Sequence, residues 1–101
     1  MLALEVSVNG QRRYVAGHAE SQMLNVIISG NRRFSSAGMS AFVAVPQSAK
    51  PDLATLSYED IRLSVGDEIV VRVVDVETVD QPVKRNTGDG SVRIEASSGG
   101  V

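Results

Sequence analysis

Few side chains in this 101-residue chain are suited to catalysis, and they are scattered along the sequence. His18 is the only histidine and cysteine is absent, so His18 lacks the second ligand or the nucleophile that a metal or catalytic role requires. The acidic pairs Glu59-Asp60 and Asp67-Glu68 are explained by solvation and turn chemistry. No Gly-x-Ser-x-Gly motif, P-loop motif or Cys–His pair occurs. We therefore predict a protein without enzyme activity, cofactor or metal ion.

The charge balance argues against nucleic acid as a partner. The sequence has 10 Lys and Arg residues and 12 Asp and Glu residues, a net charge of −2, whereas polyanion-binding proteins usually carry a basic surplus. The basic doublets Arg12-Arg13, Arg32-Arg33 and Lys84-Arg85 are interpreted as solvated surface. The first residues show neither a basic start nor an apolar run of signal-peptide or membrane-span length. We expect a cytoplasmic protein that does not contact a membrane.

Residues 2–16 predict a β-hairpin. Apolar residues occupy every second position from residue 2 to residue 8, which is typical of a half-buried strand. Asn9-Gly10 follows, and both residue types tolerate the positive φ that tight hairpin turns need. A second strand is expected over residues 11–16.

The register of this hairpin has two alternatives. A two-residue turn places Arg13 opposite Val6, whereas a three-residue loop places Tyr14 there. We favour the longer loop, because Tyr14 and Ala16 then share the apolar face with Val6 and Leu4.

Helical spacing replaces the alternation after the hairpin. Met23, Leu24, Ile27 and Ile28 recur on one stripe, between a candidate N-cap at Ser21 and a stop at Gly30. This pattern predicts a short helix that depends on packing for its stability.

Strands and one helical turn are predicted for the rest of the chain. Residues 41–45 form a strand ended by Pro46, and residues 55–61 suggest a helical turn over the core edge. The β-branched run 68–74 suits a central strand. Beyond it the composition is linker-like, with a weak strand over 91–95. The residues expected in the core are Leu4, Val6, Leu24, Ile27, Ile61, Ile69 and Val71.

This order of elements predicts an α+β fold of the β-grasp type. One helix packs across a mixed sheet, and the last strand lies beside the first in parallel. The predicted β-grasp domain covers residues 1–79, and residues 80–101 form an extended C-terminal tail that ends in Gly-Gly-Val.

The closing part of the predicted domain carries a family resemblance. Residues 55–61 and 65–74 resemble the closing third of ubiquitin-like proteins, with a Thr-Leu-Ser turn, a Tyr and an Ile for the core, and a final strand. Residues 66–69 resemble the Gly-Asp-Glu-Ile turn of bacterial sulfur-carrier β-grasp proteins. Near the end stand Gly99 and Gly100, followed by Val101. In both families the di-glycine follows the last strand within a few residues, whereas a long segment intervenes here.

The resemblance to bacterial ubiquitin-like modifiers of antiviral-defence operons implies a function in conjugation. It implies that a processing protease removes Val101, that an adenylating enzyme activates Gly100, and that a conjugating enzyme transfers the protein to a target. Glycines such as Gly99 and Gly100 lack Cβ atoms and can enter a narrow catalytic cleft.

Two alternative functions stay open, a sulfur carrier and a non-conjugated interaction or assembly module. A partner-binding patch is predicted where an exposed stripe of the last strand lies beside residues of the third strand. A strand formed by the tail either covers this patch or pairs with another copy, which would give a homo-oligomer. The residues of the predicted patch and tail strand are Phe42, Ala44, Val70, Arg72, Val74, Val92 and Ile94.

Overall fold

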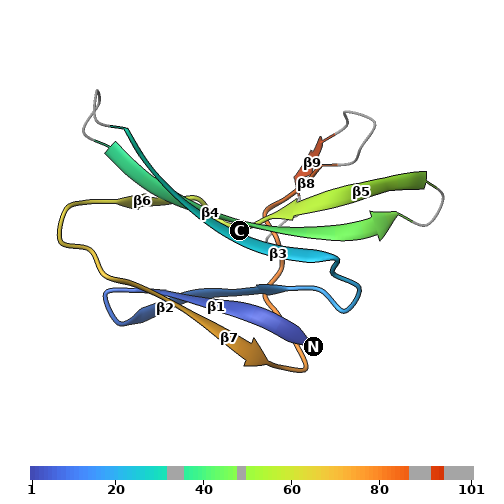
Figure 1. Cartoon of the computed structure of the whole chain (residues 1–101), viewed down its shortest axis with the longest axis horizontal. Coiled ribbons are helices and arrows are strands. Elements are labelled where there is room, and N and C mark those ends of the chain that lie inside the picture. Colours follow the sequence, from blue (N-terminus) through green and yellow to red (C-terminus); the bar gives the residue numbers. More distant parts are fainter. Residues whose placement is uncertain (32–35, 48–49, 87–91, 95–101) are drawn as a thin grey trace.

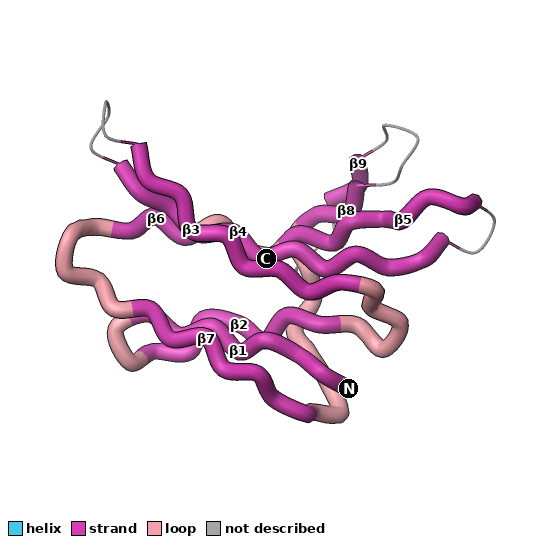
Figure 2. The backbone as a smooth tube through the Cα atoms, viewed as in Figure 1, coloured by secondary structure: helices cyan, strands magenta, loops and turns pink. Residues whose placement is uncertain are grey.

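The computed structural model describes residues 1–31, 36–47, 50–86 and 92–94. These residues form nine β-strands and no helix, arranged as two antiparallel sheets that face each other (Figure 1). Figure 2 shows the two layers in strand colour, joined at both ends by loops. The architecture of the described residues is therefore an all-β sandwich.

The smaller sheet has three strands in the order β2-β1-β7. β1 (Leu2–Val8) and β2 (Gln11–Gly17) form the predicted hairpin, and Asn9 and Gly10 adopt positive φ angles of 53° and 82°. Val8 pairs with Gln11, so the turn has two residues and the predicted three-residue loop is wrong. The predicted pairing of Val6 with Tyr14 is nevertheless confirmed, because a register shift between Val6 and Ser7 produces it. β7 (Ile69–Asp75) pairs with the other edge of β1.

The larger sheet has six strands, of which five follow the order β3-β4-β5-β8-β9. β4 (Ser36–Gln47) is the longest strand and pairs with β3 along one edge. Its other edge is shared by β6 at the start of β4 and by β5 further along. The remaining bounds are β3 (Met23–Asn31), β5 (Lys50–Ser57), β6 (Ile61–Leu63), β8 (Lys84–Asn86) and β9 (Val92–Ile94).

The core lies between the two sheets and consists of alternate residues from facing strands. The fully buried side chains with the largest volume are Met39, Val6, Val43 and Val45, all at most 1% exposed. The described residues include no buried charged side chain. Burial of these apolar side chains is the main force that holds the sheets together.

The predicted α+β fold of the β-grasp type is wrong, because the segment expected to form its helix is strand β3. Met23, Leu24, Ile27 and Ile28 satisfy helical spacing, but a short apolar run also fits a strand. β3 pairs with β4 over all nine of its residues, which satisfies the backbone groups on one edge of a segment rich in β-branched residues. Long-range pairing therefore overrides the local pattern.

Two further expectations about the elements are wrong. Residues 55–61 form no helical turn, because β5 continues to Ser57 and β6 begins at Ile61. β7 is antiparallel to β1 and lies at an edge of its sheet, not in parallel at the centre. The strand over 41–45 is confirmed, but it continues past Pro46, which pairs with Leu53.

The predicted core is only partly confirmed. Val6 and Ile61 are buried, and Leu4, Leu24 and Ile69 are partly buried. Ile27 and Val71 are 49% and 40% exposed, so their assignment to the core is wrong. Ile27 lies on the outer face of β3, and Val71 lies on an edge strand that the opposite sheet does not cover.

Candidate functional site

The structure separates the residues of the predicted partner-binding patch. Phe42 and Ala44 alternate with the buried residues of β4 and therefore lie on the outer face of the six-stranded sheet. Val70, Arg72 and Val74 lie on the outer face of the three-stranded sheet, where the Arg72 guanidinium contacts the Glu5 carboxylate at 3.3 Å. The outer faces of a sandwich point away from each other, so the two groups form no common patch.

The remaining candidate residues lie in the predicted tail. Gly99, Gly100 and Val101 lie outside the described residues. Val92 and Ile94 belong to β9, which pairs with β8, and β8 in turn pairs with β5. The described parts of the segment 80–101 thus contribute strands to the larger sheet, and association through this segment stays a prediction.

The first candidate site in the structure is the free edge of β3. β3 pairs with β4 on one side, and no other described strand pairs with its opposite side. Its sequence, MLNVIISGN, contains no charged residue and no proline, and its register with β4 has no bulge. Met23, Ile27 and Ile28 on this strand are 56%, 49% and 57% exposed. The edge thus combines backbone N–H and C=O groups that point away from β4 with exposed apolar side chains.

Other described strand edges carry the features that natural proteins use against edge-to-edge pairing. The outer edge of β2 is covered by the crossing segment, because the Asp80 N–H donates to Val15 O at 3.0 Å. β7 carries Arg72 and Asp75, and β6 has only three residues, one of them Arg62. Within the part of the chain that the structure describes, residues 23–30 of β3 have none of these protections, which distinguishes β3 among these edges.

The inner faces of the sandwich are also incompletely covered at its edge strands. Ile28 shares the inner face with its partner Met39, yet it is 57% exposed while Met39 is 1% exposed. Val73 on β7 is 68% exposed although its partner Leu4 is partly buried. Apolar side chains that point toward the core therefore remain accessible along β3 and β7.

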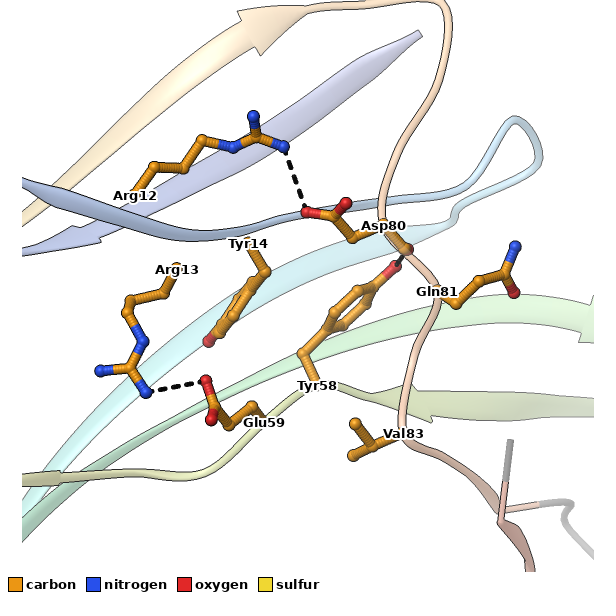
Figure 3. Close-up of a pocket in the computed structure, with 8 residues that line it drawn as sticks. All are labelled: Arg12, Arg13, Tyr14, Tyr58, Glu59, Asp80, Gln81 and Val83. Carbon is orange, nitrogen blue, oxygen red and sulfur yellow. Dashed lines mark hydrogen bonds and ion pairs between the residues drawn. The ribbon is translucent and has the colours of Figure 1, made fainter. Parts of the chain in front are cut away.

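The second candidate site is a cavity of about 420 Å³ beside two stacked tyrosines (Figure 3). The rings of Tyr14 and Tyr58 lie 5.3 Å apart with an interplanar angle of 23°. β2 supplies Tyr14 and the two arginines that precede it, and Tyr58 follows β5. Asp80 and Gln81 come from the segment that crosses between the sheets. Three parts of the chain thus form the walls.

Two ion pairs lie at this cavity. The Arg12 guanidinium contacts the Asp80 carboxylate at 3.3 Å, and the Arg13 guanidinium contacts the Glu59 carboxylate at 3.0 Å. Figure 3 shows Tyr14 between these pairs, with its hydroxyl end toward Arg13 and Glu59. The Asp80 carboxylate also accepts a hydrogen bond from Val15 N at 2.7 Å, which holds the crossing segment on β2.

The two tyrosine hydroxyls differ in their hydrogen bonding. The Tyr58 hydroxyl donates to Asp80 O at 2.8 Å and accepts from Gly17 N at 3.4 Å. Tyr14 is only 4% exposed, and its buried hydroxyl has no hydrogen-bond partner among the described residues. Burial, helped by the Glu59 and Asp60 carboxylates, raises the pKa of Tyr14 to about 12. Burial also raises the pKa of Tyr58.

Neither acidic pair nor His18 forms a catalytic arrangement in the described part of the chain. The His18 Nδ1 accepts a hydrogen bond from Glu20 N at 3.0 Å within its own loop. The Asp67 carboxylate accepts from Ser64 N at 2.7 Å, which is the turn chemistry expected for it. Within residues 1–31, 36–47, 50–86 and 92–94, no group of three potential ligands is placed to hold a metal ion. The same residues include no helix that is long and apolar enough to cross a membrane.

Comparison of the chain with protein-family models, with curated proteins and with solved structures gives no match. The candidate sites therefore stand on their own geometry. Neither site is predicted from the sequence. The tyrosine cavity joins residues far apart in the chain, and the apolar spacing in β3 predicts a helix. A signal for β3 was present, since residues 23–31 carry no charge.

Proposed function

We propose that this protein is a non-enzymatic assembly module in which a second copy of the chain continues the six-stranded sheet through β3. The observation that carries this proposal is the edge of β3 over residues 23–30, which has no charge, proline or bulge and which no other described strand covers. Backbone N–H and C=O groups along such an edge form a template for another strand. The proposed assembly is therefore an extension of the sheet and requires no change in the fold.

A second copy of the chain fits this edge because β3 is compatible with itself. In an antiparallel pair centred on Ile27, this residue lies opposite its own counterpart, and Val26 lies opposite Ile28 of the other copy. Pairing two uncharged strands brings no like charges together. Such a pair has two-fold symmetry, which closes the assembly as a dimer.

The proposed pairing also accounts for the exposed apolar side chains of β3. Opposite residues of paired strands point to the same face, so the inner faces of both copies lie on one side of the joined sheet. Ile28, which is 57% exposed, then packs beside Val26 of the other copy. On the outer face, the two Ile27 side chains cover each other.

Conjugation is not retained as the proposed function, because its premise was the β-grasp order of elements. The structure has two antiparallel sheets in place of that fold. The same correction removes the basis for a sulfur carrier. Assembly requires only residues that the structure describes, and it corresponds to the interaction-module alternative.

A single charge at the centre of β3 tests the proposal. Ile27 is 49% exposed, so Ile27→Lys is tolerated in the separate chain, but it places two ammonium groups opposite each other in the dimer. We expect the wild-type protein to be a dimer in light scattering, and Ile27→Lys to raise the dissociation constant about tenfold or more. Val65→Lys, at a fully exposed turn position, is the matched control and leaves the dimer intact.

Cross-linking tests the register as well as the interface. The chain has no cysteine, so Ile27→Cys introduces a unique thiol. Directly opposite residues in antiparallel strands have Cβ atoms about 4.5–5.5 Å apart, so oxidation should give a disulfide-linked dimer, while Val65→Cys should not. A wild-type protein that is monomeric at high concentration would refute assembly, and so would an Ile27→Lys variant that dimerises as tightly as the wild type.

A further inference from the structure

The cavity beside Tyr14 and Tyr58 contains one polar group that the protein leaves without a partner. The Tyr58 hydroxyl, from the same stacked pair, is hydrogen-bonded on both sides. The Tyr14 hydroxyl is equally buried but has no partner among the described residues. A buried hydroxyl without a hydrogen bond is costly, and native proteins rarely keep one without a reason. Tyr14 is a residue of the cavity wall, and a ligand that moves aside the partly exposed Arg13 and Glu59 side chains would give the enclosed hydroxyl its missing partner.

The chemistry of Tyr14 defines the group that a ligand must offer. Because the pKa of Tyr14 is raised to about 12, the phenol stays protonated at neutral pH and serves as a hydrogen-bond donor. A donor requires an acceptor atom from the ligand, such as a carbonyl or carboxylate oxygen. The stacked rings add an apolar surface against which a flat group can pack.

The charges around the cavity favour a neutral ligand. The four charged residues that line it form two ion pairs, Arg12 with Asp80 and Arg13 with Glu59. An anionic ligand would have to displace one of these carboxylates from its arginine, and a cationic ligand would approach two guanidinium groups. The nearby Asp60 carboxylate adds further repulsion for an anion at the Tyr14 hydroxyl. A neutral acceptor avoids both costs.

We infer that this cavity binds a small uncharged ligand of the amide type, whose carbonyl oxygen accepts a hydrogen bond from the Tyr14 hydroxyl. A volume of about 420 Å³ is within the range of small-molecule sites. The cavity walls come from β2, from the residues after β5 and from the crossing segment, and none of them belongs to β3. The inference is thus independent of the proposed assembly.

Three probes of nearly the same shape but different charge test the inference. Benzamide is neutral, benzoate is anionic and benzamidine is cationic at neutral pH, while their shapes are nearly the same. We expect benzamide at millimolar concentration to shift the backbone amide NMR signals of Tyr14, Tyr58 and Asp80, and to bind about tenfold more tightly than either charged probe. No shift with benzamide, or equal or tighter binding of benzoate or benzamidine, would overturn the inference.

Two matched variants separate a binding role of the hydroxyl from a structural one. Tyr14→Phe removes a hydroxyl that has no partner in the described structure, so the melting temperature should not fall, while benzamide binding weakens about tenfold. Tyr58→Phe removes the hydrogen bond to Asp80 O, so it should lower the melting temperature. Undiminished benzamide binding by a folded Tyr14→Phe variant would refute the role of this hydroxyl.

Discussion

At the scale of single residues, polar side chains tie the turns of this protein together. The Asp67 Oδ2 accepts a hydrogen bond from Ser64 N at 2.7 Å, and its Oδ1 accepts from Asn9 Nδ2 at 3.0 Å. The Asn9 Oδ1 in turn accepts from Glu68 N at 2.9 Å. These bonds link the β1–β2 turn to the turn before β7. The same bonds from Ser64 and Asn9 lower the pKa of the Asp67 carboxyl, because they favour its charged form.

This lowered pKa predicts a specific acid sensitivity. A group with a lowered folded pKa contributes stability above its unfolded value, here 3.8, and loses that contribution as the pH falls through the folded value. We expect the Asp67→Asn variant to lose less stability than the wild type over this window in denaturant titrations. Asn9→Gly keeps a residue suited to positive φ but removes the side-chain bonds to Asp67 and from Glu68 N, and the loss of the first should raise the pKa of Asp67. Identical acid profiles for the wild type and Asp67→Asn would contradict this prediction.

At the scale of elements, the contact between β1, β2 and the crossing segment depends on one glycine. A Cβ atom at Gly17 would lie 3.0 Å from Ala3 Cβ and 3.1 Å from Val79 Cγ1. The Gly17 N–H also donates a hydrogen bond to the Tyr58 hydroxyl, and the Gly17 carbonyl oxygen accepts one from it. The end of β2 is therefore packed closely from two directions, near the point where the tyrosine cavity begins.

We predict that Gly17→Ala destabilises the protein by about 1–3 kcal/mol, because the added methyl group overpacks this contact. Gly38→Ala is the matched control: its Cβ would lie 3.5 Å from Ile61 O, an ordinary contact, and its effect should stay within about 0.5 kcal/mol. Chemical denaturation of both variants measures the difference. Equal stabilities for the two variants would show that the chain relaxes around Gly17 without cost.

At the scale of the whole molecule, the two sheets are held together by a core of aliphatic side chains and two tyrosines. Val43 lies at the centre of β4 and is 0% exposed, while Leu24 on β3 packs against the core from the paired position. Since a domain of this size is stable by only about 5–15 kcal/mol, each such side chain is a substantial fraction of the total.

A matched pair of valines tests the sandwich arrangement. Val43→Ala removes buried methyl groups from between the sheets and should cost about 2 kcal/mol, including the cavity that remains. Val65→Ala makes the same chemical change at a fully exposed position and should be close to neutral. Thermal or denaturant unfolding compares them directly. A Val43→Ala variant as stable as Val65→Ala would be inconsistent with a core between these sheets.

The features that depend on neighbouring residues could be predicted from short stretches of the sequence. The alternation in residues 2–8, the turn at Asn9-Gly10, the strand over 41–45 and the strand predicted from the β-branched run 68–74 were readable because turn geometry, strand propensity and period-2 burial act over a few residues. The pairing of Val6 with Tyr14 followed too, because it keeps Tyr14 and Ala16 on the apolar face, but a register shift after Val6 produces this pairing and not a longer loop.

The features that depend on distant partners could not be predicted in this way. The spacing of the apolar residues in 23–31 fits both a helix and a strand, and pairing with the edge of β4 stabilises the strand. β7 lies beside β1 as predicted, but whether it runs parallel or antiparallel to β1 depends on the path of the preceding chain and not on the residues of β7. The tyrosine cavity exists because the crossing segment brings Asp80 to Tyr58 and Val15, residues that no local pattern connects. Backbone pairing and core burial are long-range contacts, so their outcome is settled by the whole chain and not by any single segment.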